Sequence, residues 1–419
     1  MARNRVIYQS EALYVSKNIN STISGEHAQL KRVQSANYNF SIERQDVNQF
    51  GQLARIDALV LNTPTVALDF TYYPTDGYNE KTLGFYVQNT QGTLLYGTGT
   101  GTGPVATGTV TGAIPYDATA AVEANFASGQ MAGSSGQNFY IVTAGEGSDL
   151  NTLTGDYALS GKSAIAIGNG FLSNYTFNAS VGNLPTASVS IEGLNIKSSA
   201  ILAMSGTGGA TGNFVLSPTI SPILGTELGY TGRLASPTEA TGANGLVETS
   251  ALRPGDLTIS FGDYTGANAT GSPLSSLEGA DGINIQSVSL ALPLSRTPIE
   301  RLGSRFAFAR VVDFPIVATM NVSAVLNEVQ SKSLAQMLDD NSKREITLTI
   351  KKPGSTQNAM IFKFKGSQLQ SESFSSSIGA NKTVDLVFQT QVGGPSDTSN
   401  GVYLSGSYSE NTVTGSWGY

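Results

Sequence analysis

Alternating polar and apolar side chains mark residues 33–42 as a β-strand. Odd positions from Ser35 to Ser41 are Ser or Asn, whereas even positions from Ala36 to Ile42 are apolar. A period of two, rich in aromatic and β-branched residues, is the signal of a strand. Similar strands are expected at 12–16, 54–61, 65–73, 138–142, 163–167 and 187–191, and again at 285–294, 306–313, 316–325, 345–351, 360–365 and 383–391. The pattern predicts an all-β protein.

Two short segments have helical spacing instead. In residues 331–338, Ser331 can cap the helix, and Leu334 and Leu338 share one face. Residues 78–85 form the weaker counterpart, because Gly84 interrupts them. We therefore expect one short flanking helix beside each of two sets of strands.

The two sets of strands match each other along the chain. Val33-Gln34-Ser35 matches Ile285-Gln286-Ser287 at a separation of 252 positions (285 − 33), and the separation becomes 251 after one extra residue. Phe177 matches Phe374 at a separation of 197 (374 − 177). A repeat of this length predicts a duplicated β unit.

These matches divide the chain into tandem domains at residues 1–195 and 250–395. The first copy carries 54 extra residues (251 − 197), which we assign to a Gly/Thr-rich insertion at about 93–145 on the outer surface. Residues 196–249 are interpreted as a linker or small insert, and residues 396–419 as a C-terminal tail with short strand patches.

Composition argues against an enzyme. The chain has no Cys and one His, so it has almost no material for a catalytic triad or a His/Cys metal site. The Gly-rich run 97–103 does not fit a phosphate-binding loop. A pair of acidic residues such as Glu43 with Asp46 could suggest glycoside cleavage, but such pairs arise by chance in a chain with 31 acidic residues. We expect no catalytic residue, cofactor or metal.

The charge balance limits the partners. The net charge is −7, which disfavours sequence-specific binding to nucleic acid but would allow a protein to enclose DNA without adhering to it. No apolar run approaches the ~18 residues of a membrane helix, and the first 17 residues lack the apolar core of a signal peptide. The sequence predicts a soluble protein made in a cytoplasm.

Charged side chains gather in two segments, residues 43–52 and 295–305, which we interpret as hairpin arms. One alternative is a solvated hairpin, and the other is an arm that contacts a neighbouring ring through ion pairs, which set register more than affinity. The candidate contact residues are Glu43, Arg44, Asp46, Arg296, Glu300, Arg301 and Arg305.

The arm segments 41–51 (SIERQDVNQFG) and 296–303 (RTPIERLG), with the closing segment 175–189, resemble the major tail, or tail tube, proteins of long-tailed bacteriophages. The resemblance implies two tandem tube domains, each a β-sandwich or half-barrel with one short flanking helix. It also implies rings that stack into a conduit for the genome, with tape measure and terminator proteins as partners in the virion. Rings of six tube domains would need three chains, a trimer with pseudo-sixfold symmetry. Two copies per chain depart from the commonest pattern.

Other interpretations remain open. The chain could be another virion component, such as a tail terminator, a baseplate hub or a decoration protein. A carbohydrate-binding fibre is less favoured, because fibres usually show shorter repeats and this chain has one Trp. A surface adhesin would need a secretion signal.

Overall fold

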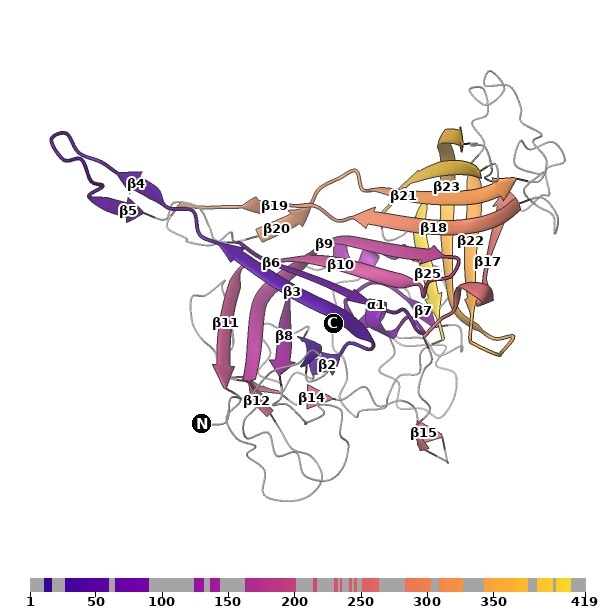
Figure 1. Ribbon diagram of the computed structural model, residues 1–419, viewed down its shortest axis with the longest axis horizontal. Coiled ribbons are helices and arrows are strands. Elements are labelled where there is room, and N and C mark those ends of the chain that lie inside the picture. The colour runs from indigo at the N-terminus through magenta and orange to yellow at the C-terminus, as the bar shows by residue number, and fades with distance from the viewer. Residues whose placement is uncertain are drawn as a thin grey trace.

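A computed structural model describes residues 11–16, 27–59, 65–89, 124–131, 136–143, 163–200, 214–216, 230–232, 234–235, 241–242, 245–246, 251–263, 283–302, 309–326, 343–375, 383–394 and 397–407. Within these ranges the fold is all-β, which confirms the predicted class (Figure 1). The described α-helices are α1 (Tyr78–Thr82) and α2 (Ser128–Met131), both short.

Eight antiparallel strands form a central sheet. In spatial order they are β3 (Val33–Ser41), β6 (Thr65–Tyr72), β10 (Thr186–Gly193), β9 (Ser163–Ser180), β18 (Ile283–Pro293), β21 (Val317–Leu326), β24 (Thr383–Gln391) and β23 (Asn358–Ser375). The sheet is continuous because β9 pairs with β18, with Leu290 opposite Phe177. Two sets of strands far apart in sequence thereby share one surface.

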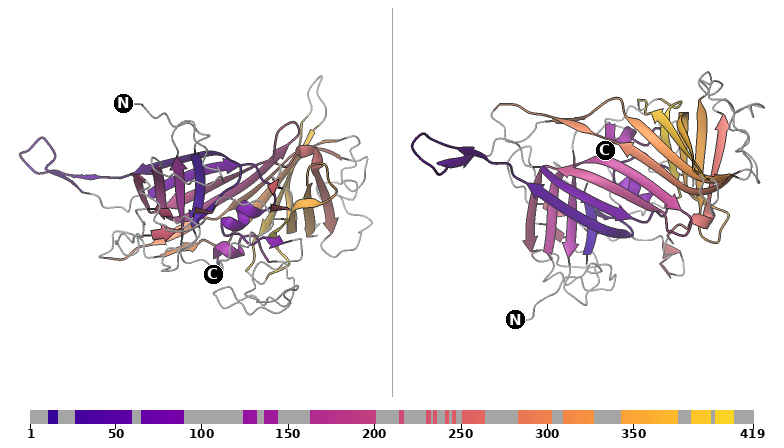
Figure 2. Two further views of the ribbon diagram at one scale, coloured as in Figure 1. Left: turned by 90° about the horizontal axis from the view of Figure 1, so that it is seen from below. Right: turned by 45° about the horizontal axis from the view of Figure 1, so that its top comes forward.

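The long strands β9 and β23 bend out of the central sheet into flanking sheets. The first half of β9 pairs with β8 (Gln137–Thr143) and β11 (Asn195–Ala200), and β8 also pairs with β1 (Glu11–Ser16), which pairs with β2 (His27–Gln29). The first half of β23 pairs with β22 (Arg344–Lys351) and β25 (Gly401–Gly406), and β22 also pairs with β17 (Leu257–Asp263). Figure 2 shows these flanking strands crossing beneath the central sheet.

Both bends contain a residue in left-handed conformation. Asn169 has φ 50° in β9 and Gly366 has φ 64° in β23. A Cβ on Gly366 would lie 2.4 Å from Oδ1 of Asn400, so this bend requires glycine. The two positions are 197 residues apart (366 − 169), the separation that relates the closing strands in the sequence.

One pattern of strand pairs occurs twice. In the N-terminal unit, defined as β1, β3, β6, β8, β9 and β10, the order is β1–β8–β9–β10–β6–β3. In the C-terminal unit, defined as β17, β18, β21, β22, β23 and β24, it is β17–β22–β23–β24–β21–β18. All of these pairs are antiparallel, so each strand has a counterpart at the same place in the other unit.

The β-bulges coincide as well. The pair β3–β6 is irregular between Val33 and Ser35, and β18–β21 is irregular between Ile285 and Ser287, 252 positions later (285 − 33). The pair β9–β10 has a bulge in β9 between Leu172 and Asn174. The pair β23–β24 has a bulge in β23 between Leu369 and Ser371, 197 positions later (369 − 172). Bulges are specific local features, and their agreement ties the two units together beyond a shared strand order.

The apolar face of the central sheet packs on the flanking sheets and on α1 and α2, as in a β-sandwich. Phe85 stacks on Phe126 with ring centroids 4.1 Å apart, and Phe126 contacts Phe362 at 6.4 Å. Phe177 lies 5.1 Å from Phe362, so aromatic rings of the two units meet in one hydrophobic cluster.

Several expected boundaries are wrong. Residues 401–406 form β25, which confirms a strand patch expected in the tail, but Val402, Tyr403 and Leu404 are buried because the strand belongs to the C-terminal flanking sheet. Residues 137–143 form the buried strand β8, which confirms the strand expected at 138–142, so the outer insertion assigned to about 93–145 was given too late an end. Residues 195–200, partly assigned to the linker, pair with β9 as β11.

Other expectations lie outside the described residues. They include the helix at 331–338 and the part of the insertion from 93 to 123. In the linker, the described pieces are the short pairs β12 (Phe214–Leu216) with β13 (Tyr230–Gly232) and β15 (Thr241–Gly242) with β16 (Gly245–Leu246), and β14 (Leu234–Ala235), which joins β2.

Candidate functional site: the edges, polar face and arms of the central sheet

The central sheet ends in two open edges. Among the described residues, β3 pairs only with β6, and the second half of β23 pairs only with β24. An open edge presents backbone N–H and C=O groups that can pair with another strand. The sheet therefore offers two surfaces for strand pairing, one at each end.

The β3 edge also exposes large apolar side chains. Tyr38 is 43% exposed and Phe40 is 53% exposed, although both point to the side of the sheet that elsewhere forms the core. Ile42, just after the strand, is 44% exposed. Apolar side chains in a row at an edge mark a contact surface more often than an isolated exposed residue does.

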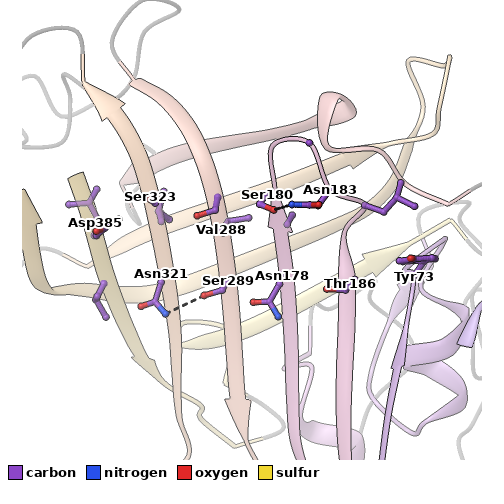
Figure 3. Close-up of a pocket in the computed structure, with 17 residues that line it drawn as sticks. Tyr73, Asn178, Ser180, Asn183, Thr186, Val288, Ser289, Asn321, Ser323 and Asp385 are labelled. Atoms are coloured by element: carbon purple, nitrogen blue, oxygen red, sulfur yellow. Dashed lines mark hydrogen bonds between the residues drawn. The ribbon is translucent and has the colours of Figure 1, made fainter. Parts of the chain in front are cut away.

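The opposite face of the sheet is polar over its whole width. Its side chains are mainly Ser, Thr, Asn and Gln, for example Ser289, which accepts a hydrogen bond from Nδ2 of Asn321 at 3.2 Å. A hollow of about 810 Å³ crosses from β9 and β10 to β18, β21 and β24 on this face (Figure 3). The charged residues on this face of the eight strands are Asp69, Glu192 and Asp385, and none of the described strand residues there is Lys or Arg.

The two arms differ in what they touch. The arm of the C-terminal unit, β19 (Arg296–Ile299) with β20 (Ala309–Val312), lies against the N-terminal unit, where Arg310 forms an ion pair with Glu192 at 2.8 Å. Arg296 donates to the carbonyl of Gln130 at 2.8 Å. Both guanidinium groups lie over the ring of Phe171, at 5.2 Å for Arg296 and 5.9 Å for Arg310. Burial, helped by the charge of Arg310, lowers the pKa of Arg296 to about 10.

The arm of the N-terminal unit, β4 (Gln45–Val47) with β5 (Asp57–Leu59), projects from the body of the molecule (Figure 1). Phe50 and Leu53 near its tip are fully exposed. Arg55 donates to Asp46 at 2.8 Å across the hairpin, in a pair exposed to solvent. The hairpin is thus held by its own contacts.

The candidate contact residues fall into three groups. Glu43, Arg44 and Asp46 lie on the projecting arm, and Glu300 and Arg301 lie near the tip of the docked arm. Arg296 instead contacts its own chain, because β19 folds back onto the N-terminal unit. Arg305 lies outside the described residues.

Sequence reasoning missed Arg310, Glu192 and Phe171, which hold the docked arm. It also did not single out Tyr38 and Phe40, because alternation alone does not tell an edge strand from a central one. Their counterparts 252 positions later, Leu290 and Leu292, are buried. Comparing the two copies therefore shows that Tyr38 and Phe40 are exposed at positions that the C-terminal unit buries, and this comparison needs the structure.

One buried carboxyl group has a shifted pKa without offering an active site. Glu80 in α1 accepts hydrogen bonds from the hydroxyls of Tyr72 at 2.7 Å and Tyr175 at 3.3 Å. Burial raises the pKa of Glu80 to about 7. The carboxyl is sealed beneath the central sheet, at 1% exposure, so no substrate reaches it. Its role is structural.

No cluster of three or more metal-ligating side chains occurs in the part of the chain that the structure describes. None of the helices in that part is long and apolar enough to cross a membrane. Comparison with models of known protein families gave no match, and comparison with curated proteins gave none either.

Proposed function

We propose that this protein is a structural subunit of a phage tail tube, which associates edge to edge into rings and stacks them into a conduit for the genome. The observation that carries the proposal is the open β3 edge, with exposed Tyr38 and Phe40, at one end of a sheet whose other end is also open. A head-to-tail contact between unlike edges produces a closed ring when the rotation closes, and a filament otherwise.

The internal repeat supports this proposal. The N-terminal and C-terminal units share strand order and bulge positions, as a tandem duplication would require. In such a duplication the β9–β18 pairing already joins one copy to the next within the chain. A ring built from whole chains then repeats the same joint between chains.

The polar face suits the wall of a conduit. Its hydroxyl and amide side chains, with the acidic groups Asp69, Glu192 and Asp385, would not hold phosphate groups, and Arg310 of the docked arm is 4% exposed and paired with Glu192. A wall rich in Lys or Arg would bind DNA and resist its movement, because each phosphate contact must be broken again. The sheet would thus enclose DNA without binding its sequence.

Ring size follows from the number of strands. Three chains with eight central strands each give 24 strands (3 × 8). At a strand spacing of ~4.8 Å and a tilt of ~40°, such a cylinder has a backbone diameter of roughly 50 Å. The number of three chains comes from the family resemblance, which implies a trimer with pseudo-sixfold symmetry.

Negative-stain electron microscopy of the purified protein tests the proposal. We expect rings, or tubes of uniform width, and an averaged cross-section with three chains per ring. Single rings that never stack would favour a terminator or decoration protein. Particles that remain monomers at all concentrations would overturn the proposal.

A further inference from the structure

The joint between the two units provides a template for the joint between two chains. In this joint, β18, the edge strand of the C-terminal unit, lies antiparallel to β9, the bent strand of the N-terminal unit. The counterpart of β18 is β3, and the counterpart of β9 is β23. These are the two strands whose outer sides are open among the described residues.

We infer that β3 of one chain pairs with the second half of β23 in a second copy of the chain, antiparallel, with Asn39 opposite Ser373. The register comes from the internal joint, in which Ala291 lies opposite Thr176. Subtracting 252 from 291 gives Asn39, and adding 197 to 176 gives Ser373. The same offsets place Asn37 opposite Ser375 and Ser41 opposite Ser371. The inference deepens the proposed function and rests on it for the ring.

Strand direction agrees with this pairing. Each neighbouring pair in the central sheet is antiparallel, so eight strands alternate in direction from β3 to β23. With an even number of strands, β3 and β23 run in opposite directions. A second copy added at either end therefore continues the alternation without a reversal.

Burial agrees as well. On the face toward the core, Tyr38 and Phe40 correspond to Leu290 and Leu292, which are at most 1% exposed. At the opposite edge, Leu369 is partly exposed, whereas its counterpart Leu172 is 1% exposed. Pairing the two edges would cover Tyr38, Phe40 and Leu369, and it would also bring Glu372, the counterpart of Tyr175, into the joint.

The second copy also supplies an occupant for a groove on the C-terminal unit. A cavity of about 500 Å³ is lined by Gln368 and Gln389, among others. These residues are the counterparts of Phe171 and Glu192, where the docked arm lies in the N-terminal unit. The base of the projecting arm, with Arg44 in the place of Arg296, would enter this groove of the neighbouring chain, which Asp397 and Lys343 also line. The arm's exposed tip then extends past it.

Disulfide trapping between two single-cysteine variants tests the register. The chain has no Cys, so no native thiol can form a competing disulfide. We would mix Asn39→Cys with Ser373→Cys under mild oxidation and follow dimers on a non-reducing gel. Directly opposite residues lie about 4.5–5.5 Å apart between Cα atoms, within the range that a disulfide spans. The matched control mixes Ser35→Cys with Ser371→Cys, which lie on the same strands and face but six positions out of register.

We expect a covalent dimer for the first mixture, at least tenfold above the control and above either variant alone. The double variant Asn39→Cys/Ser373→Cys should give a ladder that ends at the number of chains in the ring. Rings seen by microscopy without this cross-link would overturn the register and leave the proposed function standing. A cross-link without rings or tubes would support the edge pairing and overturn the tube. Equal cross-linking in the control would overturn the register.

Discussion

The strands β3 and β18 occupy the same place in their units, yet their apolar side chains end in opposite environments. Phe40 is 53% exposed, whereas its counterpart Leu292 is 1% exposed. The two strands have similar alternation, so the difference does not come from the local pattern. It arises because β9 continues the sheet beside β18, while no described strand of the same chain does so beside β3.

The arms repeat the contrast. The docked arm uses Arg296 and Arg310 to cover Phe171 on the N-terminal unit. The projecting arm extends away from the body of the molecule, and Arg55 pairs with Asp46 across its own hairpin. In both cases a feature of the C-terminal unit is completed inside the chain, and the matching feature of the N-terminal unit is left open. A second chain is the simplest way to complete it.

The largest expected effect is on assembly. Phe40→Asp places a charge on the apolar side of the open edge, and we expect rings and tubes to disappear because that carboxylate would be buried in the joint. The monomer should stay folded, since Phe40 is half exposed there. Light scattering and circular dichroism report the two outcomes separately.

Ser289→Asp is the matched control, because it adds the same charge to the polar face of the central sheet at the counterpart of Asn37, between Asn178 and Asn321 and away from the open edges. It should leave assembly intact. Leu292→Asp at the internal counterpart should instead unfold the chain, as it buries a carboxylate within the core. If tubes persisted in Phe40→Asp, the inference that a second chain covers β3 as β9 covers β18 would be wrong.

Shortening an apolar side chain to Ala should lower the free energy of unfolding much more in β18 than in β3. Leu290→Ala should lower the free energy of unfolding by about 2–5 kcal/mol, because it leaves a cavity in the core. Tyr38→Ala should lower it by less than ~1 kcal/mol in the unassembled chain. Urea titration at low protein concentration measures both, and equal losses would show that β3 is covered within its own chain.

The buried carboxyl of Glu80 should make stability depend on pH. Its pKa is raised from 4.5 to about 7, so the folded state binds the proton more tightly. The contribution of Glu80 to stability is therefore greatest below pH 4.5, declines as the pH rises through about 7, and is lowest above it. Glu80→Gln should remove this decline and raise stability at pH 8 by up to ~3 kcal/mol.

The measurement is the urea midpoint at pH 5 and pH 8 for wild type and Glu80→Gln. Glu43→Gln, on the projecting arm, is the control and should keep the wild-type pH dependence. A wild-type midpoint that rises from pH 5 to pH 8, with Glu80→Gln flat, would contradict the assigned sign.

The smallest expected effect concerns the arms. Glu192→Gln removes the partner of Arg310, which is 4% exposed, and should cost about 1 kcal/mol, since Glu192 itself is half exposed. Asp46→Asn breaks a pair exposed on both sides and should cost less than ~0.5 kcal/mol. Thermal unfolding of the two variants compares them directly. A larger loss in Asp46→Asn would mean that the projecting arm is docked in solution.

The sequence by itself determined the strands and the side of each strand that carries apolar residues. Alternation over 33–42 and 316–325 predicted strands that the structure contains as β3 and β21. The separations of 252 and 197 positions also recur in the bulges of the two units. Such features could be predicted because a strand's faces and irregularities are encoded by residues next to each other in the chain.

The tertiary structure alone decided which apolar faces are covered. Tyr38 and Leu290 have equivalent patterns around them, but among the described strands only that of Leu290 has a neighbour on each side. The burial of Val402 to Leu404 in β25 depends on partners 38 to 42 residues away (402 − 364 and 404 − 362), and the docking of Arg310 on Glu192 depends on a partner 118 residues away. Local pattern sets how a segment folds, whereas burial depends on what long-range pairing brings beside it.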